Sequence, residues 1–126
     1  MDQYAIEGTQ KNPTINFDLT KGELSVSGNS IPENSVDFYK PLLAALDEYT
    51  ASPKATTTVT FSMRYFNTSS SKRILDIFKK LEIINRGGSA VSVNWVYEDD
   101  DDDMLEAGED YQSVVDLNFT MVPIKV

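Results

Sequence analysis

The chain has 126 residues, 40% of them apolar, and a formal net charge of −9 from 20 acidic and 11 basic residues. It contains neither cysteine nor histidine, which excludes disulfides, thiolate metal sites, cysteine nucleophiles, the Ser-His-Asp triad and the commonest zinc and copper ligand. The length fits one domain spanning 1–126, and the acidic balance argues against nucleic acid and membrane as partners.

The beginning of the chain carries no targeting pattern. Residues 1–10 lack a basic region followed by an apolar run, and no apolar stretch approaches the about 20 residues of a spanning helix. We therefore expect a cytoplasmic protein.

The first 30 residues predict a β-hairpin. Tyr4 and Ile6 predict a short edge strand in front of it. Apolar residues then alternate with polar ones on both sides of a turn at Lys21-Gly22. These residues are Ile15, Phe17, Leu19, Leu24 and Val26.

A first helix is predicted after the hairpin. Ser30-Ile31-Pro32-Glu33 has a hydroxyl three residues before a Glu, which is typical of a helix start. Apolar residues recur after it at helical spacing, namely Val36, Tyr39, Leu42, Leu43, Leu46 and Tyr49. Pro41 lies inside this pattern, so either the helix is kinked there or two short helices meet.

The second half of the chain alternates strands with helices. We expect a buried strand over 56–63, continuing its alternation to Tyr65, then a helix that ends at Gly87-Gly88. A strand around Trp95, an acidic run, a short helix around Met104 to Tyr111 and a last strand over 117–124 follow. The order β-β-α-β-α-β-α-β predicts the α/β (α+β) class, with a single mixed sheet, a parallel core, an N-terminal hairpin and helices packed on it.

Four consecutive hydroxyl residues, Thr68 to Ser71, lie between the buried strand and the second helix. One of them is enough to cap a helix from Ser71 onward, and that structural role is the simplest interpretation. Four exceed what a cap needs. A phosphate there would meet free backbone N–H groups, Lys72 and Arg73, and it would repel a partner docked on that corner.

The block Glu98 to Asp103 holds six of the acidic residues, and without it the net charge would be −3. Calcium loops need ligands at alternating positions and a glycine at the sharp turn, and no glycine lies in this run. We therefore interpret the block as a solvated loop that caps the next helix, and we expect no metal site. The chain also has no glycine-rich phosphate-binding motif after a strand, so we expect no nucleotide cofactor.

Several short motifs together resemble the SiaC-type regulatory phosphoproteins of bacteria, a family similar in architecture to STAS-type anti-sigma-factor antagonists. The motifs span nearly the whole chain. They are Glu7-Gly8-Thr9-Gln10, Pro32-Glu33-Asn34 with Phe38-Tyr39 and Pro41-Leu42, Tyr65 to Ser71, Val93-Asn94-Trp95, and Glu109-Asp110-Tyr111.

The resemblance implies a partner-switching function without catalysis. Thr68 would be the phosphoacceptor of a serine/threonine kinase with a histidine-kinase-like fold, and a PP2C-type phosphatase would restore it. The unmodified form would bind and activate a diguanylate cyclase, which links the switch to cyclic di-GMP and biofilm regulation. The partner surface would include Glu33, Asn34, Asn67, Ser69, Ser70 and Ser71.

Two other classes remain as alternatives. A small enzyme or ligand-binding domain could use the hydroxyl-rich corner as an anion site, although no base or metal set accompanies it. A structural subunit of an oligomer would need an exposed apolar face.

Overall fold

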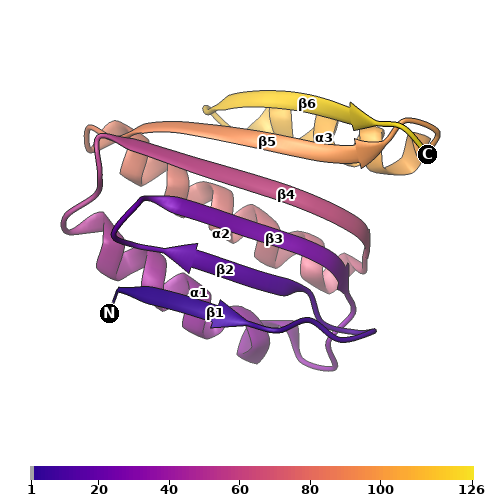
Figure 1. Ribbon diagram of the computed structural model, residues 1–126, viewed down its shortest axis with the longest axis horizontal. Coiled ribbons are helices and arrows are strands. Elements are labelled where there is room, and N and C mark those ends of the chain that lie inside the picture. The colour runs from indigo at the N-terminus through magenta and orange to yellow at the C-terminus, as the bar shows by residue number, and fades with distance from the viewer. Residues whose placement is uncertain (1) are drawn as a thin grey trace.

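The computed structural model describes residues 2–126, which form one six-stranded sheet and three helices (Figure 1). In chain order the elements are β1 (Gln3–Ile6), β2 (Thr14–Asp18), β3 (Glu23–Ser30), α1 (Ser35–Thr50), β4 (Thr56–Phe66), α2 (Thr68–Arg86), β5 (Ala90–Glu98), α3 (Asp102–Val114) and β6 (Asn118–Ile124). Among these residues, no helix is both long and apolar enough to cross a membrane.

The strands lie in the sheet in the order in which they occur in the chain. β1, β2 and β3 pair antiparallel, and β3 to β6 pair parallel, each parallel step being made through a helix. The predicted mixed sheet with a parallel core and an N-terminal hairpin is confirmed. The short edge strand expected at Tyr4 and Ile6 is also present, as β1.

All three helices cover the same face of the sheet (Figure 1). Alternate strand residues point toward them and form the core, with Phe61 and Trp95 fully buried at its centre. Their rings stack with centroids 5.7 Å apart. The other face carries no helix and is polar. One row across it aligns residues of five strands, namely Asn16, Ser25, Thr60, Asn94 and Thr120.

The start of α1 differs from the prediction. The helix begins at Ser35, and its cap is Asn34, whose side chain accepts a hydrogen bond from the Asp37 amide (3.1 Å). Ser30 is instead the buried last residue of β3. Val36, expected in the core, is 54% exposed, because it lies outside the buried face of α1. Pro41 lies inside one continuous helix, so the alternative of two short helices is wrong.

The end of β4 also departs from simple alternation. The register with β3 shifts so that Gly28 pairs with Met63 but Asn29 pairs with Tyr65, which leaves Arg64 as an extra residue. A β-bulge of this kind reverses the faces beyond it. Tyr65 is therefore 56% exposed rather than buried, and Phe66 turns inward, with its ring near Trp95.

Candidate functional site

The three helices begin at the same edge of the sheet, because each follows the carboxyl end of one of the parallel strands β3, β4 and β5. Their caps are Asn34, Asn67 and Asp101, and we call the region around these caps the helix-start edge. Free N–H groups and the positive ends of three helix dipoles are gathered there.

The first turn of α2 contains all four hydroxyl residues. The cap is Asn67, whose Oδ1 accepts a hydrogen bond from the Ser70 amide at 2.8 Å and whose carbonyl accepts one from the Ser71 amide at 2.9 Å. The Asn67 amide in turn donates to the carbonyl of Ser30 at 3.1 Å. The expectation that one of the hydroxyls caps the helix is therefore wrong, because an asparagine one residue upstream does so.

Ser70 is fully buried beneath this turn. Its hydroxyl donates to the Ser30 carbonyl (2.9 Å) and accepts from the Ser30 hydroxyl (2.9 Å), which is 2.6 Å from the Tyr39 hydroxyl. Each hydroxyl has one proton and the terminal carbonyl can only accept, so Tyr39 donates to Ser30. Burial raises the pKa of Tyr39 to about 12, which keeps it a donor. The Ser70 side chain does not reach the surface where it was expected to contact a partner.

Ser69 and Ser71 are also held by hydrogen bonds. Ser69 is exposed, but its hydroxyl is hydrogen bonded to that of Ser35, the buried first residue of α1. The Ser71 hydroxyl donates to the Thr68 carbonyl at 2.7 Å, and the Ser71 carbonyl accepts from the Tyr111 hydroxyl at 2.8 Å. α1 and α3 thus both brace the start of α2.

Thr68 differs from the three serines. Its side chain is exposed, and its hydroxyl has no hydrogen-bond partner within residues 2–126. Lys72 lies one helical turn further on and is exposed, so its ammonium group can reach the same surface. Arg73 is instead directed at Asp76, with Nε 2.9 Å from Oδ2, although the two groups are not aligned as a hydrogen bond.

The other predicted contact residues lie beside this corner. Glu33 and Asn34 are exposed in the link before α1, and the hydrogen bond between Ser35 and Ser69 brings that link to the start of α2. Both line a hollow of about 660 Å³ together with residues that the prediction missed. Of these, Thr9, Gln10, Pro32 and Phe38 belong to the motifs quoted from the sequence, and Lys11 and Asn12 complete the lining.

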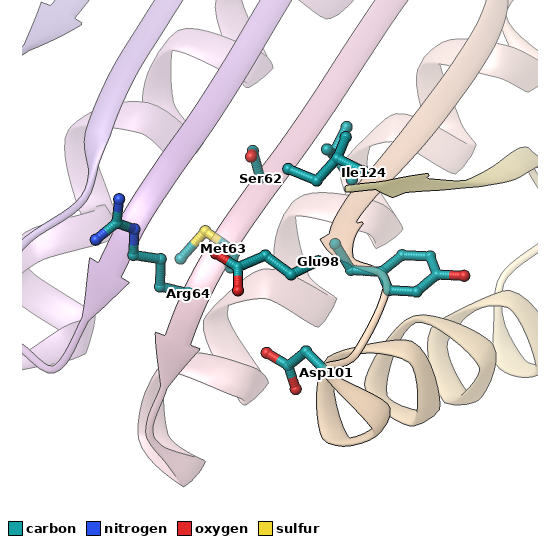
Figure 2. A pocket seen from close by; sticks show the side chains of 8 residues that line it. Ser62, Met63, Arg64, Glu98, Asp101 and Ile124 are labelled. Atoms are coloured by element: carbon teal, nitrogen blue, oxygen red, sulfur yellow. The ribbon is translucent and has the colours of Figure 1, made fainter. Parts of the chain in front are cut away.

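The acidic run lies at the same edge, where it leads from the end of β5 at Glu98 into the start of α3 at Asp102. Asp101 caps α3 through its Oδ1, which accepts from the Met104 amide at 3.0 Å, as the sequence predicts. Figure 2 shows Glu98 reaching from β5 toward β4 above Asp101, around a hollow of about 320 Å³. Within residues 2–126, no three acidic side chains are grouped so that they could hold a metal ion.

The helix-start edge can therefore present one free hydroxyl group to another protein. Its neighbours on the chain offer neither histidine nor cysteine to activate it. Burial also raises the pKa of Tyr111, so this tyrosine, like Tyr39, stays a neutral hydrogen-bond donor.

Comparison with known proteins agrees with this geometry. The family model described as SiaC family regulatory phosphoprotein matches residues 6–124. The chain belongs to the SiaC family. A relative from Pseudomonas aeruginosa, an uncharacterized protein of strain UCBPP-PA14, is 31% identical over 121 residues, which cover 96% of each chain.

Solved structures extend the likeness to three dimensions. Apo-SiaC from P. aeruginosa superposes with a TM-score of 0.88 at 31% identity, over 97% of this chain and 99% of that one. A chain in the crystal structure of the diguanylate cyclase SiaD in complex with its activator SiaC, from the same organism, gives 0.90 at 30% identity, over 96% and 99%. The predicted SiaC-type fold is therefore confirmed.

Proposed function

We propose that this chain, acting as one regulatory domain in the cytoplasm, is a partner switch controlled by phosphorylation of Thr68. The unmodified form binds and activates a diguanylate cyclase, and the phosphorylated form does not. A serine/threonine kinase with a histidine-kinase-like fold adds the phosphate, and a PP2C-type phosphatase removes it. Support comes from the family, whose members are regulatory phosphoproteins, and from the SiaC relative that activates the cyclase SiaD.

The observation that carries the proposal is the state of the Thr68 hydroxyl. Of the four adjacent hydroxyls it alone is exposed and without a hydrogen-bond partner among residues 2–126. A kinase can therefore approach it without unfolding the first turn of α2.

The fold can accept the phosphate that results. A phosphothreonine carries about −1.5 to −2 charges at neutral pH. At this position the charge lies at the positive end of a helix, beside the amides of Thr68 and Ser69, which have no hydrogen-bond partner within 2–126. Lys72, one turn away, adds a cation. We therefore expect phosphorylation to leave the domain folded.

A bound partner protein cannot accommodate this phosphate as easily as the fold itself can. Around Thr68, the exposed or partly exposed residues Glu33, Asn34, Asn67, Ser69 and Ser71 would form the contact surface. A protein docked on them would have to bury the phosphate away from water without a cation of its own in place, which is costly. The same modification thus preserves the fold and prevents the contact.

The test measures phosphate incorporation and cyclase activation with the same proteins. Incubation with ATP and the cognate kinase should add about 80 Da, the mass of one phosphoryl group on a hydroxyl, and Thr68→Ala should abolish this. Thr68→Glu should fold normally and fail to raise cyclic di-GMP synthesis by the cyclase. Thr56→Glu adds the same charge at an exposed position at the opposite end of β4 and should activate like the parent.

Each part of the proposal has its own contradicting outcome. Phosphate incorporation into Thr68→Ala at the parent level would show that the acceptor is another residue. Full cyclase activation by Thr68→Glu, or by the fully phosphorylated parent, would show that modification does not control the contact.

A further inference from the structure

Four hydroxyl residues follow one another at the start of α2, so a kinase that reaches Thr68 also reaches its neighbours. Burial explains why Ser70 is protected, because its side chain has no exposed surface. Burial would not keep a kinase from Ser69, because this residue is exposed. Ser69 also has the same chemistry as Thr68 and lies next to it in the chain, so another feature must distinguish the two.

The contact of Ser69 with α1 is that feature. Its hydroxyl is hydrogen bonded to the hydroxyl of Ser35, which lies in a different helix and is only 3% exposed. Ser35 therefore lies on the interior side of Ser69, and the hydrogen bond turns the Ser69 oxygen toward α1 and away from solvent. The Thr68 oxygen has no such partner within the described chain.

We infer that Ser35 is a specificity-determining residue for the phosphorylation of this family member, since it holds Ser69 and leaves Thr68 as the acceptor. The inference rests on the proposed function of Thr68. In the reaction, the acceptor oxygen attacks the γ-phosphorus of ATP, a new O–P bond forms, the bond from the γ-phosphorus to the bridging oxygen breaks, and ADP leaves. The hydroxyl proton passes to a base of the kinase.

A hydroxyl that is hydrogen bonded inside its own fold is a poor acceptor in this reaction. It must first break the bond to Ser35 and rotate outward before its oxygen can align with the γ-phosphorus. The remaining two serines are held independently of Ser35: Ser70 by Ser30, and Ser71 by the Thr68 carbonyl. Removing the Ser35 hydroxyl should therefore release Ser69 alone.

The experiment locates phosphate in the intact chain after incubation with ATP and the cognate kinase, by fragmentation mass spectrometry. In Ser35→Ala, the share of phosphate on Ser69 should rise about five-fold or more, the factor that corresponds to the loss of one typical hydrogen bond. In the Thr68→Ala background, which should accept no phosphate, adding Ser35→Ala should create an acceptor at Ser69. Ser35→Thr keeps a hydroxyl and should retain the preference for Thr68.

Ser89→Ala is the matched control. Ser89 is also a buried serine, 2% exposed, and its hydroxyl contacts that of Thr57 at 2.6 Å. It lies at the opposite edge of the sheet, so loss of its hydroxyl removes the same kind of contact far from the start of α2. Phosphate should stay on Thr68 in this variant. Circular dichroism should show both alanine variants folded, since alanine suits the first turn of α1 and Thr57 keeps the Tyr49 hydroxyl as a partner without Ser89.

The outcomes separate this inference from the function on which it rests. If the parent is phosphorylated on Thr68 but Ser69 stays unmodified in Ser35→Ala and in the double variant, the role of Ser35 is refuted and the switch stands. A gain at Ser69 in Ser89→Ala equal to that in Ser35→Ala would also refute it, because general loosening would then be the cause. If the parent takes no phosphate on Thr68, the proposed function itself fails.

Discussion

Replacing Gly108 by alanine should destabilise the protein, although the substitution lies inside a helix where alanine is normally favoured. Gly108 is the point at which α3 approaches the indole of Trp95. A methyl group on it would lie 2.5 Å from Cδ1 and 2.7 Å from Nε1 of Trp95, and 2.9 Å from Sδ of Met121. Real carbon contacts need about 3.5–4.0 Å.

Two opposing effects decide the magnitude. Exchanging glycine for alanine in a helix interior contributes about 1 kcal/mol of stability. Overpacking of a filled core costs about 1–3 kcal/mol. Trp95 cannot move aside freely, because its Nε1 donates a hydrogen bond to the Met104 carbonyl at 2.9 Å, and leaving that buried donor unpaired costs about 1–3 kcal/mol. The two destabilising effects should exceed the gain from alanine, so that the free energy of unfolding falls by about 2 kcal/mol.

Urea denaturation measures this difference directly, and thermal denaturation should show a midpoint lower by about 6–10 °C. Gly87→Ala is the control. A methyl group there would meet the carbonyl oxygens of Ile83 and Ile84 at 3.4 and 3.5 Å, and the backbone φ is −78°, so it should be neutral or slightly stabilising. A Gly108→Ala protein as stable as the parent, or more so, would refute the close approach of α3 to Trp95.

Three further predictions concern the cap and two titrating side chains. Asn67→Ala should cost about 1 kcal/mol in urea denaturation because the Ser70 amide loses its acceptor, whereas Asn67→Asp should retain most of the stability. The pKa of Tyr39 is raised to about 12 by burial. The stability that the neutral side chain gives the fold is therefore fully present below the usual tyrosine pKa of 10 and is lost as pH rises toward 12. Tyr39→Phe should flatten that alkaline decline in urea midpoints, and an unchanged slope would contradict it. The Asp116 amide, 2.7 Å from Oε2 of Glu82, lowers the pKa of that carboxyl. The stability that the charged carboxylate gives the fold is therefore present above the pKa of the unfolded state and is lost as pH falls through the pKa of the folded state. Glu82→Gln should reduce the loss of thermal midpoint that acidification below the usual pKa of glutamate causes in the parent. A variant that loses as much as the parent would count against this assignment.

Local patterns predicted the elements well where one face of an element is buried. Alternation of apolar and polar residues located the hairpin and the strand around Trp95, because a strand with one covered face must alternate. Prediction failed where the chain departs from a regular period. The extra residue Arg64 reverses the faces at the end of β4, and the cap at Asn34 begins α1 five residues after Ser30.

The sequence by itself determined that this is a mixed α/β protein without histidine or cysteine chemistry, and that hydroxyl groups cluster where a helix begins. Those properties depend on composition and on residues a few positions apart. Only the tertiary structure decided which hydroxyl is free. Ser70 is held by Ser30, 40 residues away, and Ser69 by Ser35, 34 residues away. Contacts between such distant residues exist only once β3, α1 and α2 have packed together, and they leave the side chain of Thr68 to solvent.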